Sequence, residues 1–136
     1  MLYLCRKDVE KACAQIDSIS VIREVFALHG SGKTILPDEA YLSWTNGEGE
    51  SVRSLSMPAY IGGEHPWAGT KIINGNISNP KKGLPRASGI IQLYDTTTTR
   101  ILCIMDSAYI SSLRTACVSA LAIDLVKGKV VLKASV

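Results

Sequence analysis

The sequence predicts an α+β fold in which helices precede and follow a strand-rich middle. Apolar residues recur at helical spacing over residues 17–30 and again over residues 108–126. Between residues 40 and 105, short β-rich segments alternate with clusters of Gly, Pro and Asn. A length of 136 residues suits one domain, so these elements are expected to share one core.

The first elements are a short strand and two helices. Residues 2–5 are apolar and predict the strand, and residues 8–15 predict a short helix. Asp17-Ser18 then offers an N-cap for a stronger helix, which Gly30 ends. The apolar positions of this second helix are Val21, Ile22, Val25, Phe26 and Leu28.

Five short segments in the middle of the chain predict strands. They are 40–44, 51–57, 70–73, 89–94 and 101–105. In the fourth, Ile90-Ile91-Gln92-Leu93 is a nearly continuous apolar run, which is typical of a strand covered on both faces.

The chain returns to helix over residues 108–126, with a stripe formed by Ile110, Leu113, Cys117, Ala120 and Leu121. Its many small residues permit close packing against a sheet or another helix. Beyond it, Val130-Val131-Leu132 predicts a last short strand.

Composition argues against several classes of protein. The net charge is only +3 and no run of Lys and Arg exceeds two residues, so we expect no nucleic-acid partner. The four cysteines lie among apolar neighbours without a C-x-x-C pair, and we interpret them as small buried residues in a reducing compartment. The apolar start is too short for a signal peptide and no apolar stretch approaches 18 residues, which predicts a cytoplasmic protein without a membrane partner.

Two motifs are set aside. Gly30-Ser31-Gly32-Lys33-Thr34 resembles part of a phosphate-binding loop, but it ends a helix, whereas a phosphate loop opens one. It is better explained as a glycine-rich helix C-cap. His29 and His65 have no carboxylate or cysteine partner at metal-ligand spacing, so no metal site is predicted.

Lys71 and Arg114 are the most informative charged residues. Lys71 lies between apolar residues in a predicted strand, where a charge facing the core needs an anionic partner; the alternative is a lysine facing solvent. Arg114 lies in the first turns of the last helix, where a guanidinium can bind a carboxylate in bidentate fashion. The alternative for Arg114 is a salt bridge to Asp106 or Asp124.

A basic turn lies between two of the predicted strands. Gly83-Leu84-Pro85 is rigid and is flanked by Lys81, Lys82 and Arg86. Basic loops of this kind can close over anionic ligands, although most are simply solvated.

Five ordered motifs together resemble the ornithine cyclodeaminase/μ-crystallin family. They are Met57-Pro58-Ala59-Tyr60, Gly69-Thr70-Lys71, Gly83-Leu84-Pro85 with Gly89, Asp106, and Arg114-Thr115-Ala116 with Ser119-Ala120. The resemblance covers about residues 40–126. The motif sequences are most similar to those of the N-(2-amino-2-carboxyethyl)glutamate dehydrogenase branch, whose members form 2,3-diaminopropionate for siderophores.

The resemblance implies roles for particular residues. Lys71 and Arg114 would hold the carboxylate of an amino-acid substrate, and Thr115 would lie near the phosphates or nicotinamide of NAD. It also implies a strand-rich substrate-binding and dimerisation domain followed by a Rossmann domain, and therefore a homodimer. The sequence departs from the family at Ser43, where an additional carboxylate-binding Arg is common; Arg53 is close by but on another predicted strand. The turn at Thr96–Thr99 lacks the usual glycine.

These 136 residues contain no Gly-x-Gly-x-x-Gly turn for a pyrophosphate. We therefore expect residues 1–126 to form the substrate-binding domain and residues 127–136 to be a remnant of the first Rossmann strand. The expected function is a truncated part of an NAD-dependent amino-acid dehydrogenase or cyclodeaminase, inactive alone and without its own cofactor. The alternative is a non-catalytic amino-acid-binding or dimerisation module.

Overall fold

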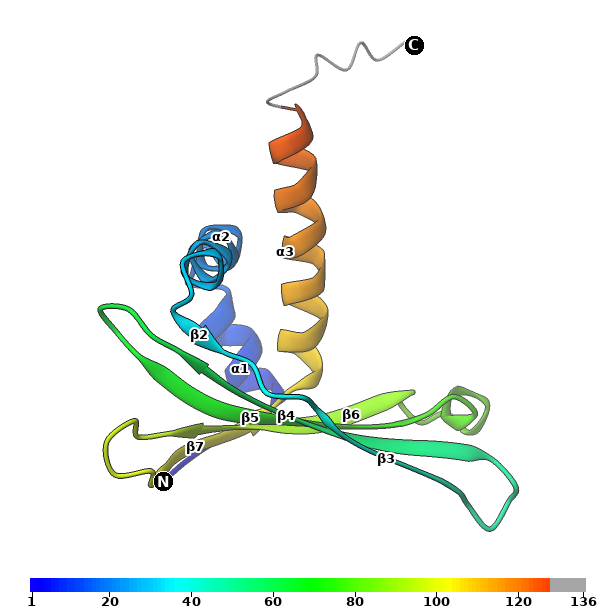
Figure 1. Ribbon diagram of the computed structural model, residues 1–136. Helices are drawn as coiled ribbons and strands as arrows, with labels where there is room; N and C mark the ends of the chain where they lie inside the picture. The colour runs from blue at the N-terminus through cyan, green and yellow to red at the C-terminus, as the bar shows by residue number, and fades with distance from the viewer. Residues whose placement is uncertain (128–136) are drawn as a thin grey trace, which may run out of the picture.

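A computed structural model, which describes residues 1–127, contains a seven-stranded sheet with three helices on one of its faces (Figure 1). The predicted α+β class is confirmed. The predicted strand at Val130–Leu132 lies outside the described residues, and the described part of the chain ends with the last helix.

The sheet has the strand order β1-β7-β6-β5-β4-β2, and β3 pairs with the same edge of β4 as β2 does. Strand β1 runs parallel to β7, and the other neighbours are antiparallel. The strands are β1 (Leu2–Leu4), β2 (Thr34–Ile35), β3 (Ala40–Thr45), β4 (Ser51–Ile61), β5 (Trp67–Asn76), β6 (Ala87–Tyr94) and β7 (Ile101–Asp106).

Strands β4 and β5 are longer than their sequences predict. The sequence indicates only 51–57 and 70–73, but the ladder between them continues from Val52–Asn76 to Ile61–Trp67. Pro58 does not stop β4, because its position falls between the partners on the other side: β3 ends its pairing at Ser56 and β2 begins at Tyr60. Pro58 pairs with Thr70 on β5 but has no partner on the β2/β3 side, so a missing N–H on that side leaves no broken ladder bond.

The helices are α1 (Arg6–Cys13), α2 (Ser18–Gly30) and α3 (Ala108–Lys127). Asp17 caps α2 as predicted, because its carboxylate accepts hydrogen bonds from the N–H groups of Ile19 (3.2 Å) and Ser20 (3.1 Å). Gly32 follows α2 with a φ of 74°, so the glycine-rich segment is a helix C-terminus, as expected. Helix α1 begins and ends two residues earlier than predicted.

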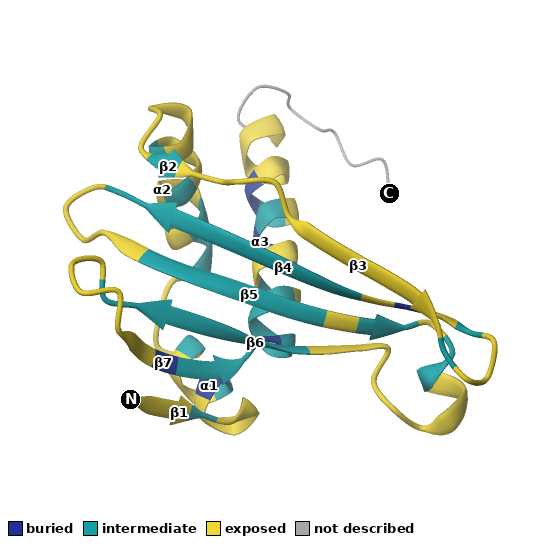
Figure 2. Ribbon diagram, turned by 60° about the horizontal axis from the view of Figure 1, so that its bottom comes forward, coloured by how far each residue is buried: buried dark blue, intermediate teal, exposed yellow. Residues whose placement is uncertain are grey.

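The helices pack on the sheet through α1 on β7, α2 on β4 and α3 on β6, and α1 and α2 also contact α3. Few of the described residues are buried (Figure 2). The apolar ones are Val9, Val52, Cys103, Cys117 and Leu121. The prediction that all four cysteines are buried is confirmed for Cys103 and Cys117. It is wrong for Cys5, which is exposed at the start of α1, and Cys13 is only half-buried.

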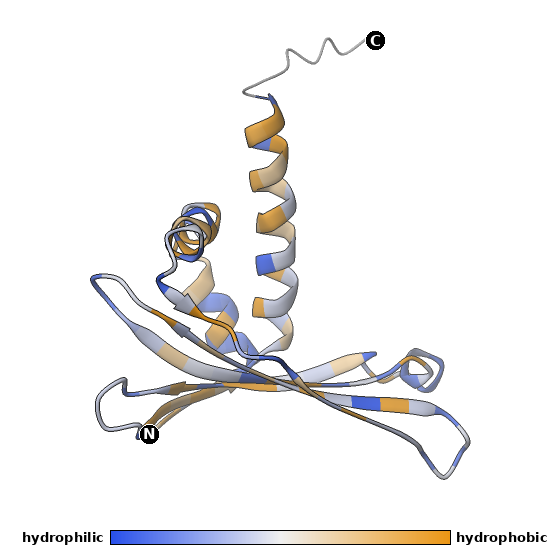
Figure 3. Cartoon of the chain, viewed as in Figure 1, coloured by the Kyte–Doolittle hydropathy of each residue, from blue (hydrophilic) through white to orange (hydrophobic). Residues whose placement is uncertain are grey.

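No described element covers the second face of the sheet (Figure 1). The apolar run in β6 predicts cover on both faces, whereas within residues 1–127 only the helix-bearing face is covered. Helix α3 also extends beyond the sheet, and its last turns expose Ile123, Leu125 and Val126 by 52–54% (Figure 3). This one chain therefore leaves apolar surface on both the sheet and the helix.

Helix α3 has the length and composition of a membrane-crossing helix, with a mean hydropathy of 1.4 over 18 residues. This is weak evidence, since core helices of soluble proteins have the same composition. It nevertheless corrects the expectation that no apolar stretch approaches 18 residues. Here α3 packs against α1, α2 and β6.

Candidate functional site

Lys71 lies on the helix-bearing face of the sheet. Its register partners are Met57 on β4 and Ile91 on β6, and directly paired residues share a face. Two positions further along the same face, Ile73 lines a groove together with residues of α3. The side chain of Lys71 is half-buried, so the structure selects the inward orientation over the solvent-facing alternative.

The charge on Lys71 is unfavourable in this position. Burial lowers the pKa of its ammonium group, the nearby guanidinium of Arg114 lowers that pKa further, and Glu39 opposes the shift. Among residues 1–127, Lys71 forms no ion pair with a carboxylate. A bound anion would stabilise the charge of a partly desolvated cation that lies near a second cation.

Arg114 lies in the second turn of α3 and is exposed. It forms neither of the salt bridges considered from sequence, since the ion pairs of the described chain involve only Arg6 and Lys82 as cations. Asp106 instead accepts a hydrogen bond from the N–H of Ala108 (3.0 Å) and so caps the start of α3. Within residues 1–127, the guanidinium of Arg114 therefore has no carboxylate partner.

Lys71 and Arg114 thus come from different elements, and the charge of Arg114 acts on Lys71 on the helix-bearing side of the sheet. Their combined charge is suited to a carboxylate, which a guanidinium can bind through two parallel hydrogen bonds. The pairing of a strand lysine with a helix arginine depends on how β7 leads into α3, which the local sequence does not encode.

Thr115 lies on a face of α3 made of small and hydroxyl-bearing residues. Its hydroxyl donates a hydrogen bond to the carbonyl of Ser111 (2.8 Å). This face lines an open groove whose opposite wall is formed by Ile73 and Ala87. The other α3 residues that line it are Ala108, Ser111, Ser112, Ala116 and Ser119.

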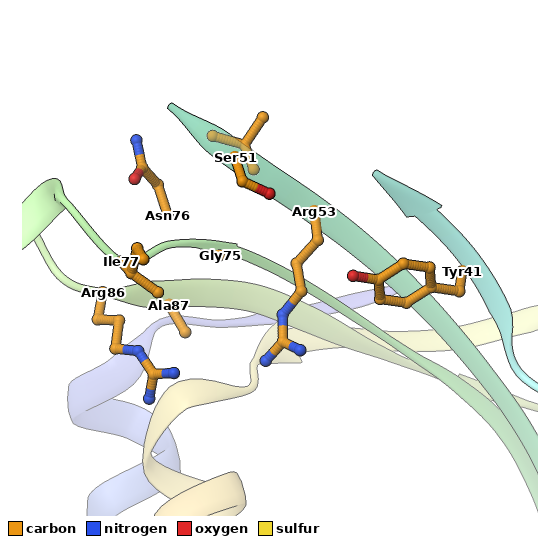
Figure 4. A pocket seen from close by; sticks show the side chains of 9 residues that line it. Tyr41, Ser51, Arg53, Gly75, Asn76, Ile77, Arg86 and Ala87 are labelled. Atoms are coloured by element: carbon orange, nitrogen blue, oxygen red, sulfur yellow. The ribbon is translucent and has the colours of Figure 1, made fainter. Parts of the chain in front are cut away.

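The basic residues of the turn after β5 have different surroundings. Lys82, at the end of the short 3-10 helix η1 (Asn79–Lys82), pairs with both Glu48 and Glu50, so its charge is already balanced. Arg86 instead lines a cavity of about 190 Å³, together with Tyr41 and Arg53 (Figure 4). The local sequence does not predict that Arg53 and Arg86 lie together, because Arg53 is on β4, Arg86 immediately precedes β6, and β5 runs between these two strands.

Among the described residues, no group of three His, Cys, Asp or Glu side chains could hold a metal ion. His29 contacts Thr34, with 2.7 Å between Nδ1 and Oγ1.

Comparisons with known proteins agree with the fold. The family model described as ornithine cyclodeaminase/mu-crystallin matches residues 1–129. The N-((2S)-2-amino-2-carboxyethyl)-L-glutamate dehydrogenase of Staphylococcus aureus (strain NCTC 8325 / PS 47) is 37% identical over 126 residues. That alignment covers 90% of this chain and 38% of the relative.

Two solved structures are similar as well. The crystal structure of CmnK has a TM-score of 0.85 at 40% identity, over 88% of this chain and 37% of the other. An archaeal alanine dehydrogenase dimer with bound NAD has a TM-score of 0.71 at 32% identity, over 87% of this chain and 34% of the other. The chain thus spans somewhat more than a third of the length of these relatives. Together with the family match, these similarities establish that the chain belongs to the ornithine cyclodeaminase/mu-crystallin family.

Proposed function

We propose that this chain is the substrate-binding part of an NAD-dependent amino-acid dehydrogenase, and that Lys71 and Arg114 bind a carboxylate of the substrate. The observation that carries this proposal is the half-buried Lys71, whose pKa is lowered by burial and by Arg114 while no described carboxylate pairs with it. A substrate carboxylate beside Lys71 and Arg114 would stabilise the charged form of the lysine and offset the repulsion between the two cations.

The substrate we propose is an N-(2-amino-2-carboxyethyl)glutamate, which would place the chain in 2,3-diaminopropionate and siderophore-precursor metabolism. The similarity to the staphylococcal dehydrogenase supports this choice. We also propose a cytoplasmic location, in keeping with four free cysteines.

NAD, when bound, would accept the hydride removed from the substrate. The groove beside Thr115 fits part of such a cofactor, because α3 presents several hydroxyl groups there and Ala87 leaves room. A pyrophosphate needs a glycine turn that these 136 residues do not contain. We therefore propose that the NAD-binding part lies outside them, and that this chain by itself binds amino acid without oxidising it.

Isothermal titration calorimetry of the 136-residue chain tests both statements. We expect N-(2-amino-2-carboxyethyl)-L-glutamate to bind, and Lys71→Ala and Arg114→Ala each to weaken its binding at least tenfold. Lys7→Ala, on the exposed part of α1, serves as the matched control and should change nothing. Unchanged binding in both site variants would rule out the assigned roles, and micromolar binding of NAD would show that the cofactor part is present.

A second candidate function is a dimerisation module. It is favoured by the uncovered sheet face, where Tyr3, Leu42 and Trp44 are exposed by 65%, 61% and 48%. We propose that two copies pack through this face. Light scattering coupled to gel filtration should give twice the monomer mass, and Trp44→Glu should restore the monomer; a monomeric wild type at high concentration would exclude the interface.

A further inference from the structure

A second cationic site lies at the other end of the same sheet face. Arg53 on β4 and Arg86 immediately before β6 line one cavity of about 190 Å³, and both guanidinium groups lie on one side of the sheet (Figure 4). Tyr41 on β3 lines it as well. Strand β5 runs between the two arginines, and its Gly75 forms the floor of the cavity.

The glycine at this position keeps the space between the arginines open. Gly75 is the register partner of Arg53 on one side and of Ala87 on the other. A Cβ at Gly75 would lie 3.6 Å from the Nε of Arg53 and 3.6 Å from the carbonyl oxygen of Arg86. Any larger side chain would therefore extend into the volume that the two guanidinium groups share.

No carboxylate of the described chain balances the two charges. Neither arginine forms an ion pair within residues 1–127. The nearby Glu48 and Glu50 are occupied by Lys82, and Glu50 also accepts hydrogen bonds from Asn46 (3.0 Å) and Asn76 (2.8 Å). Both residues are exposed and an arginine does not lose its proton, so the two positive charges remain free to bind an anion from outside.

The backbone that carries the pair is held in place before any ligand arrives. The carbonyl of Arg86 accepts a hydrogen bond from the N–H of Asn76 (3.0 Å), and the preceding carbonyl of Pro85 accepts one from the side-chain amide of Asn79 (3.0 Å). Arg53 lies within a strand that is paired on both sides, with Ser43 and with Gly75. Both Cα positions are therefore set by the sheet, which reduces the entropy lost when a ligand orders the side chains.

The two cationic sites lie along one line. Lys71, Ile73 and Gly75 alternate along β5 on the helix-bearing face, and the rise of a strand puts about 13 Å between the backbones of Lys71 and Gly75. The groove lined by Ile73 and Thr115 adjoins the cavity, since Ala87 lines both. An extended molecule with an anionic group at each end can lie along this track.

We propose that Arg53 and Arg86 form a second carboxylate site, which binds the distal carboxylate of a substrate whose amino-acid carboxylate is held by Lys71 and Arg114. The ligand class is an extended amino acid with carboxylates at both ends, and the arginine pair selects it over amino acids with one carboxylate. The assignment of the first site rests on the proposed function; the second site rests on the cavity and its unbalanced charges.

The test is calorimetry of the 136-residue chain with N-(2-amino-2-carboxyethyl)-L-glutamate and with L-alanine. Arg53→Gln and Arg86→Gln should each weaken binding of the polycarboxylate about tenfold and leave binding of L-alanine unchanged, since a charge-assisted pair is lost at one end only. Arg53→Lys and Arg86→Lys should retain part of the affinity. Lys81→Gln, an exposed cation beside the same turn that does not line the cavity, is the matched control.

The outcomes separate the two proposals. If Lys71→Ala weakens both ligands while the two glutamine variants leave the polycarboxylate-to-alanine affinity ratio unchanged, the second site is overturned and the proposed function stands. If the glutamine variants weaken the polycarboxylate but Lys71→Ala and Arg114→Ala change nothing, the arginine site stands and the proposed roles of the first site fail. If Lys81→Gln weakens polycarboxylate binding as much as the arginine variants do, the loss of affinity reflects general surface charge, and the second site is overturned.

Discussion

Arg53 lies directly opposite Ser43 in the ladder between β3 and β4. Directly opposed residues of antiparallel strands point to the same face, with Cβ atoms about 5 Å apart. The family resemblance leads one to expect an arginine at Ser43, and the partner strand supplies one beside it. A cation at this part of the helix-bearing face is therefore retained, although it comes from the neighbouring strand.

This relationship predicts the effect of Ser43→Glu. The new carboxylate would face the guanidinium of Arg53, and an opposite-charge cross-strand pair should raise the free energy of unfolding by about 0.5 kcal/mol. The same pair would occupy Arg53, so binding of a polycarboxylate should weaken. Urea denaturation and calorimetry measure the two effects, and Ser43→Gln separates charge from size. A gain in affinity would contradict the prediction.

Lys71→Met should stabilise the ligand-free protein at neutral pH. The pKa of Lys71 is lower in the folded chain than its usual 10.5, so the charged form is disfavoured by folding at pH values below that lowered pKa. As the pH rises through the folded pKa towards 10.5, the unfolded chain binds more protons and the wild type gains stability. The advantage of Lys71→Met should therefore shrink towards pH 10.5, as denaturation at successive pH values would show. A constant difference would point to packing instead of charge.

Glu50 should make stability depend on acid pH. Hydrogen bonds from Asn76 and Asn46, and then Lys82, lower the pKa of its carboxyl from 4.5 to about 2. A lowered pKa stabilises the folded chain above pH 4.5, and this contribution is lost as the pH falls from 4.5 to 2. Glu50→Gln should be less stable than wild type at pH 7, and the difference should shrink as the pH falls towards 2. Glu64→Gln, an exposed carboxylate in the turn after β4, is the control and should follow the wild type.

Thr99→Gly should raise stability. Thr99 has a φ of 59°, the only positive φ among the non-glycine residues of the described chain, in the turn where the family resemblance leads one to expect a glycine. The left-handed conformation destabilises a β-branched residue in the folded chain by about 1–2 kcal/mol. Glycine relieves this strain but loses more conformational entropy on folding, which offsets part of the gain. We expect a net gain of about 0.5–1 kcal/mol in thermal denaturation. Thr96→Gly in the same turn has no such strain to relieve and should lower stability slightly.

Gly89→Ala should be among the most destabilising single-methyl substitutions. A Cβ at Gly89 would lie 2.0 Å from the carbonyl oxygen of Ile72 and 2.9 Å from the Cα of Ile73, both of which are backbone atoms of β5. The strands would have to separate, at a cost of about 3 kcal/mol or more. Gly47→Ala, in the turn between β3 and β4, meets nothing within 4 Å and is the control. Equal melting temperatures for the two variants would show that β5 and β6 are less closely paired.

Local patterns in the sequence determine the fold class and most of the elements. Helical spacing and the Asp17 cap locate α2, alternating β-rich segments locate the centres of β3 to β7, and the ordered motifs around Lys71 and Arg114 identify the family. These signals succeed because capping, turn formation and amphipathic periodicity depend on residues only a few positions apart. The full extent of β4 and the short β2 were missed, because partner strands extend them beyond their own hydrophobic pattern.

Only the tertiary structure decided which charges meet. A strand shifted by one residue presents its other face, so the inward orientation of Lys71 depends on the register with β4 and β6. The same long-range pairing places Arg53 opposite Ser43, brings Arg53 and Arg86 to one cavity, and leaves Lys82 bound to Glu48 and Glu50. The sequence by itself determined that cations are present in these segments; strand pairing, which joins residues tens of positions apart, decided which of them are neutralised within the described chain and which are not.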